Sequence, residues 1–131
     1  MSSSATVVVI DDDPSVRRSL TRLLLSGGYD VLTFSSAEQF LAMPSTPPPA
    51  CLVTDVRMPG MTGLDLLDAL RASRPTLPII LISGDADADA LAHAQATGAV
   101  RFLLKPFSSE DLFDALAEAL GRNRAAPESE T

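Results

Sequence analysis

The chain has 131 residues, a formal net charge of −7 at pH 7, and 46% hydrophobic against 21% charged residues. This length and composition favour one globular domain with a single well-filled core. The acidic balance argues against nucleic-acid binding by this chain itself, because phosphate backbones are bound by lysine and arginine. Charges or prolines interrupt every apolar run before it reaches the roughly 18 residues that a membrane span needs, so we expect no membrane partner.

The N-terminal stretch MSSSATVVVIDDD lacks the basic start and long apolar middle of a secretory signal. Cys51 is the one cysteine, so no internal disulfide can form. Both features predict a cytoplasmic location, where thiols stay reduced. The apolar flanks of Cys51 favour a buried, inert thiol over a catalytic one.

Short β-rich runs alternate with longer helical ones, beginning with residues 6–10. This unbroken β-branched run, TVVVI, predicts a buried strand. Asp13 then fits a helix N-cap, with Pro14 at the first helical position. One face of that helix is apolar and carries Val16, Leu20, Leu23 and Leu24. Gly27 and Gly28 end the helix.

Residues 30–34 alternate weakly and predict a second strand at an edge of the sheet. The following helix opens in SSAEQFLAM, where Ser35 and Glu38 have the spacing of a capping box. Residues 44–50, PSTPPPA, predict a proline-rich loop. The next strand, CLVT, follows directly.

The second half continues the alternation. A third helix lies within residues 63–74, with Leu64, Leu67 and Leu70 facing inward, and residues 78–82 form another buried strand. A fourth helix lies within residues 86–98, closed by Gly98. The last pair is a strand over residues 100–104 and a helix over residues 108–120 that carries Leu112, Phe113, Leu116 and Leu120.

Five strands therefore alternate with five helices, which predicts an α/β domain. Three of the strands are apolar throughout, so the sheet should be parallel and covered by helices on both faces. We expect this domain to span residues 1–122, with residues 123–131 as a polar tail or the start of a linker.

Polar residues follow several of these strands. The carboxyl ends of parallel strands lie at one edge, where ligands bind. That edge should collect the residues after the first, third, fourth and fifth strands: Asp11, Asp12 and Asp13, then Asp55, Ser83 and Lys105. Converging carboxylates favour a hard divalent cation such as Mg²⁺, although capping explains Asp13 adequately.

Asp55 has two interpretations. It caps a turn, as most loop aspartates do, or its carboxylate attacks phosphorus and becomes an aspartyl phosphate. A transferred phosphoryl group needs its charge neutralised and its oxygens positioned. Mg²⁺, Lys105 and the Ser83 hydroxyl could supply those contacts.

The ordered motifs VIDDDPSVRRSL, VTDVRMPGMTGLDLL, PIILISG, GAV and FLLKPF resemble the receiver domain of two-component response regulators, from about Thr6 to Leu120. DVRMPGMTG and KPF are most similar to the FixJ-type branch, whose receivers often precede a DNA-binding helix-turn-helix domain. The resemblance implies a flavodoxin-like, CheY-like (βα)5 fold: a five-stranded parallel sheet in the order 2-1-3-4-5, flanked by five helices.

The resemblance also implies roles for particular residues. Asp55 would be the phosphoacceptor, with Lys105 paired to the phosphoryl oxygens. Asp11 and Asp12 would form the acidic pair, with Asp12, Asp55 and the Arg57 carbonyl contacting Mg²⁺. The switch residues would be Ser83, which moves toward the phosphoryl group, and Phe102, which changes rotamer with it.

By this resemblance the chain is a phosphorylation-dependent signalling switch and not an enzyme beyond phosphotransfer to itself and autodephosphorylation. The phosphoryl donor would be a sensor histidine kinase or a phosphotransfer protein. A homodimer through the fourth helix, fifth strand and fifth helix is a further expectation. His93, the one histidine, is expected on the surface of the fourth helix and not as a phosphodonor.

Two departures and two alternatives accompany this interpretation. Ser83 stands where many relatives have threonine, which keeps the hydroxyl. Asp85 adds negative charge near the edge, which would slow phosphotransfer or alter the phosphoryl lifetime. One alternative is a degenerate receiver that binds partners without phosphorylation. The other is a Mg²⁺-dependent aspartyl-phosphate phosphatase of the haloacid-dehalogenase kind. That class needs an aspartate where this chain has Arg57.

Overall fold

The computed structural model describes residues 5–43, 49–84 and 87–123. Ten elements alternate along the chain: β1 (Thr6–Ile10), α1 (Pro14–Ser26), β2 (Asp30–Phe34), α2 (Ala37–Leu41), β3 (Cys51–Asp55), α3 (Gly63–Ser73), β4 (Ile79–Ser83), α4 (Ala88–Thr97), β5 (Arg101–Leu104) and α5 (Ser109–Asn123). The alternation and the class predicted from sequence are confirmed. Among the described residues, no helix is both long and apolar enough to cross a bilayer.

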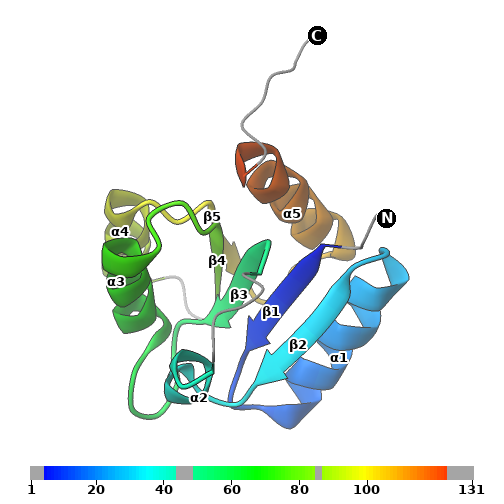
Figure 1. Ribbon diagram of the computed structural model, residues 1–131, viewed down its shortest axis with the longest axis horizontal. Coiled ribbons are helices and arrows are strands. Elements are labelled where there is room, and N and C mark those ends of the chain that lie inside the picture. Colours follow the sequence, from blue (N-terminus) through cyan, green and yellow to red (C-terminus); the bar gives the residue numbers. More distant parts are fainter. Residues whose placement is uncertain (1–4, 44–48, 85–86, 124–131) are drawn as a thin grey trace, which may run out of the picture.

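The strands form one parallel sheet in the order β2-β1-β3-β4-β5, which confirms the predicted topology (Figure 1). β2 lies at an edge, as its weak alternation predicts. β3 and β4 are buried along their whole length, because helices cover both faces. Cys51 lies in β3, where burial raises the pKa of its thiol to about 12 and keeps it inert at neutral pH.

Two hydrophobic clusters fill the space between the sheet and its helices. On one face α1 and α5 contribute apolar side chains such as Leu24 and Leu116. On the other, α2, α3 and α4 contribute side chains such as Phe40, Leu67 and Ala94 (Figure 1). The strands alternate their side chains between these two clusters, so the sheet is the rigid centre from which every strand end is positioned.

Most of the predicted helix boundaries are found. The Asp13 side chain caps α1 and Pro14 is its first residue, while Gly27 follows its last. Gly98 closes α4 in the left-handed conformation, with φ of 90°. α5 runs through Asn123, and the predicted domain boundary after residue 122 stays a prediction.

The predicted capping box of α2 is wrong. Ser36, not Ser35, is the N-cap, and its hydroxyl accepts the Gln39 N–H at 3.0 Å. The Gln39 side-chain oxygen accepts the Ser35 N–H at 2.8 Å. The shift by one residue places Ala37 and Phe40 in the core. The other differences are that Leu66 of α3 is buried while Leu64 is only partly buried, and that residues 44–48 of the proline-rich loop, Asp85 and residues 124–131 lie outside the described residues.

Candidate functional site

Three carboxylates meet at the carboxyl edge of the sheet. Asp11 and Asp12 follow β1, and Asp55 is the last residue of β3, which pairs with β1. One ligand oxygen from each lies within 4.8 Å of the others. Asp11 and Asp55 are buried, 2% and 8% exposed, whereas Asp12 is exposed. The strand order therefore brings together the acidic residues that the sequence placed at this edge.

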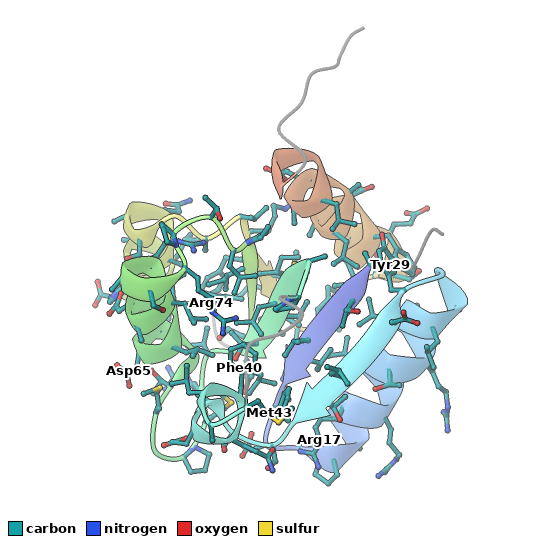
Figure 2. The ribbon with its side chains drawn as sticks, viewed as in Figure 1. Arg17, Tyr29, Phe40, Met43, Asp65 and Arg74 are labelled. Carbon is teal, nitrogen blue, oxygen red and sulfur yellow. The ribbon has the colours of Figure 1, made fainter. Side chains whose placement is uncertain are left out.

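Asp11 is held from two sides. Its Oδ1 accepts the Asp13 N–H at 2.9 Å, and its backbone carbonyl accepts a hydrogen bond from Arg17 Nη1 at 2.7 Å. Arg17 lies at the start of α1, close to this edge (Figure 2). Arg17 is not among the site residues predicted from the sequence. The available signal is that a residue one turn into a helix directs its side chain back toward the helix start.

Lys105 supplies positive charge between two of the carboxylates. Its Nζ lies 3.6 Å from Asp55 Oδ1 and 3.8 Å from Asp11 Oδ2. The Lys105 backbone N–H donates to the Ser83 carbonyl at 2.8 Å, which fixes the residue beside the end of β4. The peptide between Lys105 and Pro106 is cis.

The two buried carboxylates have unfavourable surroundings. Burial is the main cause that raises the pKa of Asp55, and the Asp11 charge raises it further, while Lys105 opposes both. Burial also raises the pKa of Asp11, against the hydrogen bond from the Asp13 N–H and the charge of Lys105. One lysine therefore does not compensate the cluster fully, which is typical of a functional site.

Ser83 and Phe102 lie on neighbouring strands, Ser83 at the end of β4 and Phe102 within β5. Ser83 is 1% exposed and ends β4, next to Leu104 in the β4–β5 register. Phe102 is half-buried and packs against the cluster beneath α2, α3 and α4. Phe102 also lines a surface hollow with Asp87, Ala88, Leu91 and Leu104.

Arg57 and His93 lie on the surface. The Arg57 guanidinium is 3.6 Å from the Asp87 carboxylate, at the start of α4. His93 Nε2 contacts Asp68 Oδ1 at 2.8 Å, between α4 and α3, and its side chain is 41% exposed. The predicted surface position of His93 is therefore confirmed.

The donor set fits Mg²⁺. One oxygen from each of the three carboxylates lies within 4.8 Å of the others, and the pKa values of Asp11 and Asp55 are raised. A divalent cation beside these groups would offset their mutual repulsion. Protein nitrogen and sulfur ligands, which zinc prefers, are not part of the clusters found among the described residues. The chemistry of these donors favours a hard, oxygen-seeking ion.

A five-stranded parallel sheet in the order 2-1-3-4-5, with clustered carboxylates and a lysine at its carboxyl edge, defines the class of CheY-like α/β domains. The chain matches the response regulator receiver domain over residues 7–117 and belongs to that family. The recognition made from the sequence motifs is confirmed.

Similar proteins and a solved structure agree with this family assignment. Nodulation protein W of Bradyrhizobium diazoefficiens is 42% identical over 98% of this chain and 57% of its own length. The transcriptional regulatory protein FixJ of the same species is 38% identical over 99% of this chain and 63% of its own length. The crystal structure of full-length FixJ from B. japonicum superposes with a TM-score of 0.85 at 37% identity, covering 95% of this chain and 61% of that one.

The chain thus spans about six tenths of the length of these relatives. It is a receiver domain of the two-component response regulator family, a class of signalling domain that interacts with histidine kinases and generally binds Mg²⁺ at an acidic pocket. This family is consistent with phosphorylation-dependent switching.

Proposed function

We propose that the chain is a phosphorylation-dependent switch whose phosphoacceptor is Asp55. The observation that carries this proposal is the position of the Asp55 carboxylate. It lies at a strand end beside Asp11 and Asp12, with Lys105 Nζ 3.6 Å away. A side chain that only capped a turn would need none of these charged neighbours.

The transfer is a substitution at phosphorus. A carboxylate oxygen of Asp55 forms the new O–P bond, while the P–N bond to a phosphohistidine of the partner breaks and the imidazole nitrogen keeps that electron pair. The Lys105 ammonium is placed to donate to the phosphoryl oxygens and to offset their charge, because its Nζ lies 3.6 Å from Asp55 Oδ1. The donor is a sensor histidine kinase or a phosphotransfer protein.

The residues that would hold Mg²⁺ are Asp12, Asp55 and the Arg57 carbonyl, with Asp11 as the second member of the acidic pair. When bound, Mg²⁺ supplies positive charge that lowers the repulsion among the carboxylates and the incoming phosphoryl oxygens. Asp11 and Asp55 supply two buried carboxyl groups at this edge, and Arg17 holds the Asp11 backbone in place.

Ser83 and Phe102 form the proposed switch. The Ser83 hydroxyl, buried at the end of β4, moves to the phosphoryl group, and Phe102 follows with a new rotamer. Phe102 borders both the core cluster and a surface hollow, so the two proposed arrangements are a ring packed on the cluster and a ring turned toward the hollow. A phosphoryl group that binds one arrangement better shifts the population toward it.

The output is a change in partner binding on the face formed by α4, β5 and α5, and one such partner is a second copy of this chain. Relatives carry names of transcriptional regulators and are longer than this chain, so a DNA-binding output would belong to another domain. We propose a cytoplasmic location, and no direct nucleic-acid contact by this acidic domain.

Intact-mass measurement after incubation with acetyl phosphate tests the proposal. The chain should gain one phosphoryl group when Mg²⁺ is present and none when it is absent. The Asp55→Asn variant should gain none in either condition. No gain by the folded wild-type chain would favour the degenerate receiver, and a gain retained by Asp55→Asn would refute the assignment of the site.

A further inference from the structure

Glu38 reaches from α2 to the loop between β3 and α3, 23 residues further along the chain. Its Oε2 accepts the Met61 N–H at 2.9 Å. The same oxygen lies over Gly60, where a Cβ would come within 2.6 Å of it. Gly60 has φ of +75°, a conformation that glycine adopts readily. The bend of the loop and the Glu38 carboxylate therefore fit each other.

α2 is a fixed support for this contact. Ala37 is fully buried and Phe40 is 7% exposed. The Phe40 ring packs edge-on against Phe34 with centroids 5.5 Å apart, and the Arg74 guanidinium lies 5.8 Å from its centre (Figure 2). Because these neighbours hold the helix, a side chain projecting from its first turn keeps a defined position.

The loop is also held by its side chains and at its base. Met58 is 7% exposed in the core, Met61 packs against the same cluster, and the Arg57 guanidinium lies 3.6 Å from the Asp87 carboxylate. The Val56 N–H donates to the Ile82 carbonyl at 2.8 Å, and the Gly63 N–H donates to the Val56 carbonyl at 2.9 Å. These bonds close residues 56–63 into a narrow loop. At the tip of this loop, the Met61 N–H donates a hydrogen bond to Glu38, which belongs to another element, α2. Arg57, whose carbonyl is a proposed Mg²⁺ ligand, lies in the same loop.

We propose that Glu38 is a positioning residue that holds the β3–α3 loop so that the Arg57 carbonyl is ready for Mg²⁺. This rests on the proposed function, because it deepens the metal site placed there. The Met61 N–H lowers the pKa of Glu38, so the carboxylate is charged and the hydrogen bond charge-assisted at neutral pH. Without this acceptor the loop samples more conformations, and metal binding must order it at a cost in affinity.

Three variants separate positioning from general stability. Glu38→Ala removes the acceptor, Glu38→Gln keeps an oxygen at the same place, and Glu110→Ala removes one exposed carboxylate from α5 as a charge-matched control. We expect Glu38→Ala to raise the Mg²⁺ Kd about 3–10-fold by calorimetric titration, the range that loss of one such hydrogen bond predicts. Glu38→Gln should stay within about twofold of wild type, and Glu110→Ala should be unchanged.

The phosphorylation rate should show the same split. With acetyl phosphate, Glu38→Ala should be slower at low Mg²⁺ and equal to wild type at saturating Mg²⁺. Amide hydrogen exchange of Met61 should be faster in Glu38→Ala and close to wild type in Glu38→Gln, with or without the metal. An unchanged Mg²⁺ Kd in Glu38→Ala would overturn the positioning role.

The two proposals fail in different ways. If the wild-type chain binds Mg²⁺ but gains no phosphoryl group at saturating metal, the proposed function fails while the positioning role is still judged by the Kd values. If the wild-type chain is phosphorylated and Glu38→Ala binds Mg²⁺ normally, only the positioning role fails. A Glu38→Ala variant that loses affinity without rescue by Glu38→Gln also overturns the role assigned to the hydrogen bond.

Discussion

Asp55 and Asp11 are carboxyl groups in buried positions, although a charged carboxylate is more stable in water. Both are almost inaccessible, and burial raises the pKa of each. A carboxylate in such a position lowers the stability of the metal-free fold when it ionises. The arrangement is understandable if the site is built for a cation and a phosphoryl group, since both are charged species that these residues would meet.

Asp55→Asn should therefore raise the melting temperature of the metal-free protein by a few degrees at pH 7. The folded pKa of Asp55 lies above its unfolded value, so its penalty is absent below the unfolded pKa and grows as the pH rises through the folded pKa. Thermal unfolding in a chelator, from pH 3.5 to pH 8, should show the advantage of the variant increasing with pH. A difference that stays constant over this range would contradict the explanation.

Asp13 and Asp12 are neighbours with different tasks. The Asp13 Oδ1 accepts both the hydroxyl and the N–H of Ser15 at 2.8 Å, which lowers the pKa of Asp13 and caps α1. Asp13→Ala should lower the melting temperature and leave the Mg²⁺ Kd within about twofold, as expected for loss of a cap alone. Asp12→Ala should weaken Mg²⁺ binding strongly with little effect on metal-free melting. Loss of metal binding in Asp13→Ala would move that residue into the site.

The elements themselves were largely predictable from the sequence. Unbroken apolar runs predict the buried strands, and the Asp13–Pro14 pair and Gly98 predict helix ends, because these signals act over a few residues. The edge that carries Asp11, Asp55 and Lys105 follows from parallel strand direction alone. The sequence motifs predict the order of the strands through family resemblance, which periodicity cannot supply.

Other features depend on contacts that local patterns do not carry. The one-residue error in the cap of α2 arose because Ser35 and Ser36 both have a Glu or Gln three residues later, and the burial of Phe40 selects between them. The bonds from Arg17 to Asp11 and from Glu38 to Met61 require the fold before they can be seen.

The backbone at the end of β3 lies close to the start of α3. A Cβ at Gly63 would clash with the Asp55 carbonyl oxygen. Gly63→Ala must displace either the strand end or the helix start, and we expect it to cost about 1–3 kcal/mol, as overpacking does. It should also weaken Mg²⁺ binding, because Asp55 moves with its backbone. Chemical denaturation and calorimetry check both effects, and a variant with wild-type stability would show that the close approach is not required.

At the scale of the whole molecule, the acidic edge and the proposed docking face are joined by β5. Lys105 follows this strand, while Phe102 and Leu104 within it reach the surface beside α4. Leu91 and Leu104 are 38% and 45% exposed, so the part of this face between α4 and β5 presents apolar side chains to solvent. Lys105 directly follows β5, and Ser83 pairs with Leu104 in the sheet. A displacement of either residue therefore needs to move only the end of β5 to alter the face formed by α4, β5 and α5.

Phosphorylation should therefore change self-association through this face. We expect the phosphorylated wild-type chain to form a dimer in light-scattering measurements and the unphosphorylated chain to stay monomeric. Leu104→Asp should stay monomeric in both states while still gaining the phosphoryl group, because a charge would be buried in the interface. A phosphorylated Leu104→Asp variant that dimerises as well as wild type would place the interface elsewhere.

Amide NMR spectra with Mg²⁺, before and after acetyl phosphate, test the switch most directly. In the wild-type chain, shifts should change near Asp55 and also at Ser83, Phe102 and along α4, and Asp55→Asn should show none of these changes on adding acetyl phosphate. Chemical-shift changes confined to the neighbours of Asp55 in a fully phosphorylated sample would contradict the proposal. They would show that phosphorylation is not transmitted to the face formed by α4, β5 and α5.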